Sequence, residues 1–225
     1  KLISEIAASG LKVRNIYALE GHLSGKAEVV SAKEMERISQ LKTASTSLAV
    51  VEQPRHKTPA KAPADRLTLA LDGVQNPGNL GTIIRLADWF GVEDIFCSED
   101  TADCFNPKVV QASMGAVFRT RVDYVDLAQW LAACGRPVYG ASLQGVPLDG
   151  TLRPEGGAVL VIGNESRGIS PEVMAQVTHP VLIPNLGGTA ESLNAGVAAG
   201  ILMNWMTLQG VQGVQVLMNE KGKDI

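Results

Sequence analysis

The sequence lacks the features that mark membrane and secreted proteins. No apolar run reaches the roughly 18 residues that a membrane-spanning helix needs. The first residues have no signal-peptide layout. The chain begins with Lys1 instead of an initiator Met, so we expect its natural N-terminus to lie upstream. We therefore expect a protein without a membrane partner.

Cysteine and histidine are both scarce. Cys97, Cys104 and Cys134 form no CxxC pair and are odd in number, which indicates reduced thiols in a cytoplasmic protein. The 3 histidines are scattered along the chain and have no metal-ligand spacing. We therefore expect neither disulfides nor a bound metal.

The fingerprints of common nucleotide-binding enzymes are also missing. The segment "GVQNPGNLG", residues 73–81, spaces its glycines as G-x-x-x-x-G-x-x-G, whereas a dinucleotide-binding turn needs G-x-G-x-x-G. No phosphate-binding loop of the GxxxxGK[ST] type is present. These absences exclude a nicotinamide-dependent oxidoreductase and a nucleoside triphosphatase as the leading interpretations.

What is present is typical of a soluble globular protein, with 45% hydrophobic and 19% charged residues. The net charge is −3, but its distribution is uneven. Residues 1–65 hold 10 Lys and Arg against 7 Asp and Glu, whereas residues 66–225 hold 10 against 16. This asymmetry is a weak indication of a polyanion partner for the N-terminal quarter.

A segment rich in proline and charge divides the chain. Residues 52–65, "EQPRHKTPAKAPAD", contain almost no large apolar side chain, which predicts an extended linker. Before it, β-rich patterns over 13–19 and 48–52 enclose a helical pattern over 31–42. We expect residues 1–51 to form a small α/β domain that is incomplete at its N-terminus.

After the linker, strand and helix patterns alternate. Short apolar runs predict buried parallel strands in "LTLAL", "DIFC", "RPVYGA", "AVLVIG" and "PVLIP". Helical stretches are predicted to begin near Asn79, Asn106, Asp126, Ser170 and Thr189. Residues 66–225 should therefore form an α/β domain with a parallel sheet and helices on both faces. Ligands bind beyond the carboxyl ends of such strands.

The loop after the first of these strands leads into "NLGTIIR", residues 79–85. Asn79 is well placed to cap the helix. The apolar stripe that faces the sheet is predicted to be Leu80, Ile83, Ile84 and Ala87. Arg85 lies about 140° from Leu80 around the helix and projects away from this stripe. It either makes surface ion pairs or clamps a phosphate or carboxylate.

Two further strand-end loops carry polar groups. In "GNESRG", residues 163–168, Gly163 permits either a tight turn or a close approach to a ligand. Glu165 is either solvated or functional. In "IPNLGGTAESLNAGVAAGI", residues 183–201, Ser192 and Asn194 either cap a helix or line a site. That helix is small or apolar all round, so we expect it to be packed on two sides, with a second subunit as one possible neighbour.

Together and in this order, "NLGTIIR", "GNESRG" and "IP…SLN" resemble the three signature motifs of the SpoU (TrmH-like) family of the SPOUT superfamily, whose members methylate RNA ribose. The segment "ASMGAVFRTRV", residues 112–122, is similar to the intermediate segment of that family. The resemblance covers residues 66 to about 209. Residues 1–51 resemble the substrate-binding domain often fused to these enzymes. Asn185 stands where the family commonly has Met.

The resemblance implies a C-terminal trefoil knot, a homodimer, and S-adenosylmethionine as the cofactor. It implies methyl transfer to a ribose 2′-hydroxyl of RNA. Ribosomal RNA is favoured over transfer RNA, because a separate substrate-binding domain is expected at the N-terminus. The implied catalytic set is Asn79, Arg85, Glu165, Ser192 and Asn194. The implied cofactor contacts are Gly163, Ile183, Leu186 and Leu193. The alternative is a knotted RNA-binding protein without catalysis, against which the intact catalytic set argues.

Overall fold

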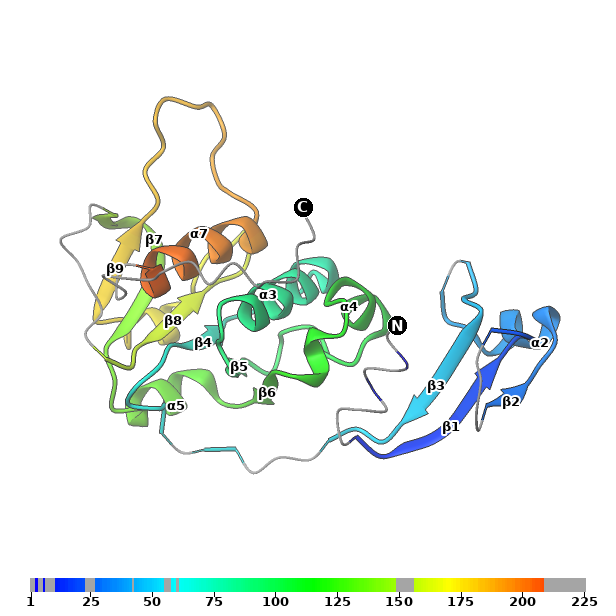
Figure 1. The fold of residues 1–225 in the computed structure, drawn as a ribbon. Helices are drawn as coiled ribbons and strands as arrows, with labels where there is room; N and C mark the ends of the chain where they lie inside the picture. Colours follow the sequence, from blue (N-terminus) through cyan, green and yellow to red (C-terminus); the bar gives the residue numbers. More distant parts are fainter. Residues whose placement is uncertain are drawn as a thin grey trace.

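The computed structural model describes residues 3, 6, 11–22, 27–41, 43–54, 58–59, 61–148 and 156–208. They build two separate sheets, joined by the segment between β3 and β4 (Figure 1). The larger sheet carries the three motifs, and the smaller one is built from the N-terminal quarter of the chain.

The smaller sheet has the strand order β2-β1-β3. β1 (Val13–Ala18) lies in the centre, parallel to β2 (Glu28–Val29) and antiparallel to β3 (Ser47–Val51). α2 (Ala32–Ile38) begins in a capping box, in which Ser31 Oγ accepts from the Glu34 N–H and the Glu34 carboxylate accepts from the Ser31 N–H. Both predicted strands and the predicted helix are present, and the helix ends earlier than expected.

Six parallel strands form the larger sheet, in the order β6-β5-β4-β8-β7-β9. They are β4 (Thr68–Leu71), β5 (Asp94–Cys97), β6 (Arg121–Tyr124), β7 (Val138–Pro147), β8 (Val159–Ile162) and β9 (His179–Leu182). Every residue of β4, β5 and β8 is buried, because helices cover both faces of the sheet. The predicted α/β class with a parallel sheet is confirmed.

The helices divide between two hydrophobic cores. α3 (Pro77–Trp89), α4 (Pro107–Ala112) and α7 (Ala195–Leu208) pack on one face, while α5 (Leu127–Ala133) and α6 (Pro171–Met174) pack on the other (Figure 1). Successive strand residues alternate between the cores: Leu69 and Leu71 face the first, and Ala70 faces the second. A short 3-10 turn, η1 (Ala116–Phe118), follows α4. The predicted stripe of α3 is fully buried, whereas Arg85 is exposed.

Two parts of the larger sheet differ from the sequence-based expectation. β6 was not predicted as a strand, because its residues Arg121 and Asp123 break the apolar pattern. Arg121 forms ion pairs with Asp123 and with Asp94 of β5, so its charge is compensated by two carboxylates. β7 also continues to Pro147, beyond the predicted run over 136–141.

The three cysteines are free and buried, as expected for reduced thiols. Burial raises the pKa of Cys104 to about 11 and also raises the pKa of Cys97, so both thiols stay protonated near neutral pH. Within the part of the chain described, no helix has the length and apolar character needed to cross a membrane. The trefoil knot stays a prediction.

Candidate active site

The three motif loops meet at one edge of the larger sheet. They follow β4, β8 and β9, and parallel strands place all their carboxyl ends on the same side. β4 and β8 are direct neighbours, and β7 separates β8 from β9. Residues more than 80 positions apart in sequence are therefore brought together.

Asn79 joins the three loops through hydrogen bonds. Its amide nitrogen Nδ2 donates to Oε1 of Glu165 at 2.5 Å, and its Oδ1 accepts from Nδ2 of Asn194 at 2.9 Å. A single side chain from the first motif thus contacts one residue from each of the other two. Asn79 is half-buried, so these bonds are partly shielded from water.

The expected capping role of Asn79 is wrong. Asn76 is the N-cap of α3, and its Oδ1 accepts from the N–H groups of Gly78 and Asn79 at 2.8 and 3.3 Å. Pro77 follows at the first helical position, where its missing N–H costs nothing. Because Asn76 takes the capping role, the Asn79 side chain is free to bond Glu165 and Asn194.

Asn194 combines the two roles that the sequence left open. Its Oδ1 caps α7 by accepting from the N–H groups of Gly196 and Val197 at 2.9 and 3.3 Å. Its Nδ2 donates to Asn79. The helix begins at Ala195, not near Thr189 as predicted.

The chain before α7 is organised by Asn185. Its Oδ1 accepts from the N–H groups of Gly187 and Gly188, and its Nδ2 donates to the carbonyl oxygens of Gly188 and Ala190. These local bonds satisfy backbone groups in a non-helical form, which explains the late helix start. In Figure 1 the segment between β9 and α7 projects from the body of the domain.

Asn164 holds the second motif loop against the first. Its Nδ2 donates to the Gly73 carbonyl at 2.7 Å, and its Oδ1 accepts from the N–H groups of Ser166 and Arg167 at 2.9 and 3.1 Å. Sequence reasoning missed this residue. An Asn directly before a turn is the signal that could have identified it.

The turn also explains Gly163. A Cβ on Gly163 would lie 2.4 Å from the backbone of Gly168 and Ile169, and the backbones of Asn164 and Gly168 exchange two hydrogen bonds. The tight turn therefore accounts for the glycine, whether or not a ligand also approaches it. α6 begins where it was predicted, with Ser170 as its N-cap residue, and the Ser170 N–H donates to the buried carboxylate of Asp72 at 2.6 Å.

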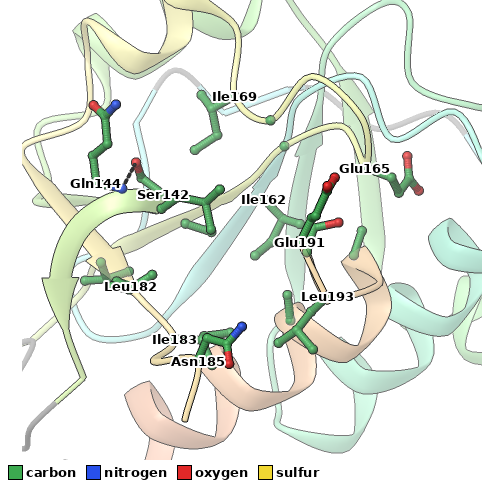
Figure 2. A pocket seen from close by; sticks show the side chains of 18 of the residues that line it. Ser142, Gln144, Ile162, Glu165, Ile169, Leu182, Ile183, Asn185, Glu191 and Leu193 are labelled. Atoms are coloured by element: carbon green, nitrogen blue, oxygen red, sulfur yellow. Dashed lines mark hydrogen bonds between the residues drawn. The ribbon is translucent and has the colours of Figure 1, made fainter. Parts of the chain in front are cut away.

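A cavity of about 890 Å³ opens beside these loops. Figure 2 shows its apolar side chains, including Ile162, Ile169, Leu182 and Ile183, with the carboxylates of Glu165 and Glu191 on one side. Such a volume lies within the range of about 300–1,000 Å³ typical of small-molecule sites. Sequence reasoning missed Glu191, because it lies within a loop that was expected to be helical.

The predicted site residues divide into three groups. Those that line the cavity are Gly163, Glu165, Ile183, Leu186, Ser192 and Leu193. Asn79 and Asn194 are bonded to Glu165 or to each other beside it. Arg85 is exposed on α3, six residues after Asn79, and does not line the cavity. Among the described residues, no hydrogen bond of the Ser192 side chain is found.

Leu186 and Leu193 are unusual for cavity-lining leucines because they are 97% and 46% exposed. When a ligand covers an apolar side chain at the mouth of a cavity, apolar surface leaves water and the free energy of the complex falls. The arrangement therefore suits a ligand with a flat or apolar part held between the 183–193 segment and the 163–168 turn.

Comparison with known proteins gives one consistent result. A family profile described as the SpoU rRNA Methylase family matches residues 66–204. The chain is 35% identical over 179 residues to a protein of Bacillus subtilis (strain 168) named as a 23S rRNA guanosine 2'-O-methyltransferase. The match covers 78% of this chain and 70% of that protein. Another relative is longer, and the matched part of this chain covers only 45% of that protein's length.

Solved structures agree with the sequence comparison. A TrmH-family structure from Porphyromonas gingivalis has a TM-score of 0.78 and 39% identity, covering 92% of this chain and 86% of that one. The SpoU methyltransferase AviRb from Streptomyces viridochromogenes, in complex with AdoMet, has a TM-score of 0.81 and 25% identity, covering 94% of this chain and 88% of that one.

We expect Asn164→Ala to destabilise the protein by about 2–3 kcal/mol, because three hydrogen bonds worth about 1 kcal/mol each are lost. Ser166→Ala is the matched control: it is exposed, lies in the same turn, and should change stability by less than about 0.5 kcal/mol. Urea unfolding followed by circular dichroism measures both. Equal, small losses for the two variants would show that Asn164 does not hold the loop.

Proposed function

Because the chain belongs to the SpoU rRNA Methylase family, we propose that it methylates a ribose 2′-hydroxyl of RNA with S-adenosylmethionine as the methyl donor. The observation that carries this proposal is the meeting of Asn79, Glu165 and Asn194, one from each motif, beside a largely apolar cavity. Ribosomal RNA is the favoured substrate class, since the Bacillus relative is named as a 23S rRNA methyltransferase. A cytoplasmic location is part of this proposal, because ribosomal RNA is the proposed substrate.

The residues of the cavity fit the proposed cofactor. Gly163, Ile183, Leu186 and Leu193 would hold it through backbone groups and apolar contacts, as their position around the cavity allows. The AviRb structure contains AdoMet, which supports the same cofactor here. When bound, S-adenosylmethionine supplies a methyl group activated by a positively charged sulfonium.

The polar residues would orient the ribose. Glu165 is held by Asn79, which is held in turn by Asn194, so the three side chains share one fixed geometry. Ser192 lies at the cavity wall and can bond the same substrate. Orientation of reacting groups can contribute up to roughly 7–11 kcal/mol to a rate enhancement.

Arg85 is proposed to grip an RNA phosphate and align the hydroxyl. Its guanidinium is a poor general base, because an arginine side chain does not give up its proton in ordinary proteins. It is exposed on the side of α3 away from the sheet, where a phosphate can reach it. The hydroxyl proton would then leave to a substrate phosphate or to water.

The small unit, residues 1–51, is proposed to bind the RNA, with residues 52–65 as the connection to a methyltransferase domain over 66–225. A net positive charge in residues 1–65 supports this division. The family profile also begins at residue 66.

A homodimer is proposed to form through α3 and α7. α7 packs against α3, where Gly196 approaches Thr82 and Gly200 approaches Leu86. The outer face of this pair carries exposed apolar residues, namely Trp89 at 82%, Val197 at 53% and Ile201 at 39%. Val197 and Ile201 are one helical turn apart, and Trp89 is two turns beyond Thr82. A second copy would cover this apolar surface.

The function is tested by transfer of labelled methyl from S-adenosylmethionine to RNA from a strain that lacks this gene. Ribosomal and transfer RNA are assayed separately. We expect alkali-stable label at one linkage of ribosomal RNA. Arg85→Ala should lower kcat/KM roughly 10- to 100-fold, and Arg85→Lys should not restore it, because Lys lacks the planar fork of Arg.

Three other outcomes would contradict parts of this account. Label in transfer RNA alone would correct the substrate class. Near-native turnover by Arg85→Lys would remove the role of the guanidinium fork. RNA binding without any methyl transfer would identify the protein as a non-catalytic RNA binder.

For the dimer, we expect Ile201→Glu to raise the dissociation constant more than about 100-fold, because an unpaired charge would be buried at the interface. Val29→Glu is the control, since Val29 is 67% exposed in the small sheet. Sedimentation equilibrium measures both variants. Dimers of unchanged affinity in Ile201→Glu would rule out the α3–α7 surface as the interface.

A further inference from the structure

The second half of the predicted linker is packed against the larger domain. Pro59 accepts a hydrogen bond at its carbonyl from Nε1 of Trp130 at 3.0 Å, and Thr58 Oγ1 donates to Asp123 at 3.1 Å. Ala62 is 4% exposed and belongs to the second core. We call the described residues from Thr58 to Arg66 the docked segment.

Glycine at position 157 is required by this docking. Its N–H donates to the Ala64 carbonyl at 2.7 Å. A Cβ there would lie 2.3 Å from the Pro63 oxygen and 2.6 Å from the Ala64 carbon. These are backbone atoms, so they can make room only if the docked segment moves away. Gly157 therefore lets the segment lie directly on the domain.

From Ala64 to Arg66 the docked segment lies at the amino ends of the strands, opposite the cavity. Gly157 precedes β8, Arg66 precedes β4, and Arg66 pairs with Glu93 and Asp94 at the start of β5. These are amino ends of parallel strands, whereas the motif loops follow the carboxyl ends. A change in the docked segment can therefore leave the cavity intact.

Docking shortens the connection between the two units. In the small sheet, Glu52 is the last anchored residue: its N–H donates to the Lys12 carbonyl, and its carboxylate pairs with Lys12 and Arg14. Among the described residues that follow Glu52, Thr58 is the first with a side-chain bond to the larger domain. Six residues can span at most about 20 Å, whereas the sixteen from Glu52 to Thr68 could span about 55 Å.

We propose that the docked segment sets the reach of the small unit and so presents RNA to the cavity, with Gly157 and Trp130 as positioning residues. This inference rests on the proposed function, in which the small unit binds RNA. Effective concentration falls roughly as the −3/2 power of tether length. Release of the segment lengthens the tether from six residues to sixteen, and this should weaken the apparent affinity for RNA about fourfold.

The first test is Gly157→Ala with unmodified ribosomal RNA as substrate. We expect KM for RNA to rise about fourfold while kcat changes less than twofold, and the radius of gyration from X-ray scattering to increase. An increased radius with unchanged KM would overturn the proposal, as would a fall in kcat with unchanged KM.

The second test inserts ten Gly-Ser residues between Gln53 and Pro54. With the segment docked, the insertion lengthens the tether from six residues to sixteen and should raise KM about fourfold. In the Gly157→Ala background the same insertion lengthens the tether from sixteen residues to twenty-six, which should raise KM for RNA only about twofold. Equal effects in both backgrounds would contradict the proposal.

A milder variant covers the case in which Gly157→Ala does not fold. Thr58→Val with Trp130→Phe removes the two side-chain hydrogen bonds at the start of the segment, keeps the ion pairs of Arg66, and leaves an aromatic ring to stack on Phe96. Trp205→Phe is the matched control, because Trp205 is also 7% exposed and its Nε1 has no partner among the described residues. We expect KM to rise in the double variant and to stay unchanged in the control; a rise in both would overturn the proposal.

Failure of this inference and failure of the proposed function give different results. If the unaltered protein transferred no methyl group, the proposed function would fail. The same variants would then be compared by fluorescence anisotropy with labelled ribosomal RNA. A fourfold weaker binding in Gly157→Ala would still support the inference, and unchanged binding would overturn it.

Discussion

The site depends on the side chain of Asn79, which bonds Glu165 on one side and Asn194 on the other. A primary amide suits this position because it donates through nitrogen and accepts through oxygen at the same time. Glu165 needs a donor, and the Nδ2 of Asn194 needs an acceptor. Only a residue with both groups can satisfy these neighbours, so the three loops adopt one mutual arrangement.

The parallel sheet makes this contact possible. It places the loops after β4 and β8 side by side and brings α7 across α3 on the same face. Other asparagines fix each loop internally: Asn76 caps α3, Asn164 closes the turn after β8, and Asn185 organises the segment after β9. The opposite edge of the sheet holds the docked segment. The fold thus places the proposed methyl-transfer site and the segment proposed to limit the reach of the small unit at opposite edges of the sheet.

Much of the fold could be predicted from the sequence, because buried parallel strands have a strong signature. Runs such as "LTLAL" and "AVLVIG" became fully buried strands. β6 was missed because Arg121 and Asp123 lie within it, and the ion pair of Arg121 with Asp94 of β5 is not visible in a local pattern. The docking of Pro59 and Ala62 was hidden for a related reason: it depends on Trp130 and Gly157, which lie about 70 or more residues away.

The sequence motifs predicted which residues form the site, and their functional roles stay a prediction; the local geometry around them was predicted less well. The motifs identified Asn79, Glu165 and Asn194, but local rules assigned Asn79 to a cap that Asn76 provides. From the sequence alone, Asn76 and Asn79 are equivalent candidates for the N-cap of α3. The contacts of Asn79 with the other two loops determine that Asn76 is the cap. The late start of α7 follows likewise from four bonds of Asn185 that no helix periodicity reveals.

The most direct measurement of the central claim is a double-mutant cycle on kcat/KM for methyl transfer to ribosomal RNA. Asn79→Ala removes the acceptor, and Asn194→Ser removes the donor while a serine can still cap α7. If the Asn79 contacts hold the site together, the double variant will lose little more activity than Asn79→Ala alone. Losses that multiply independently would contradict the account.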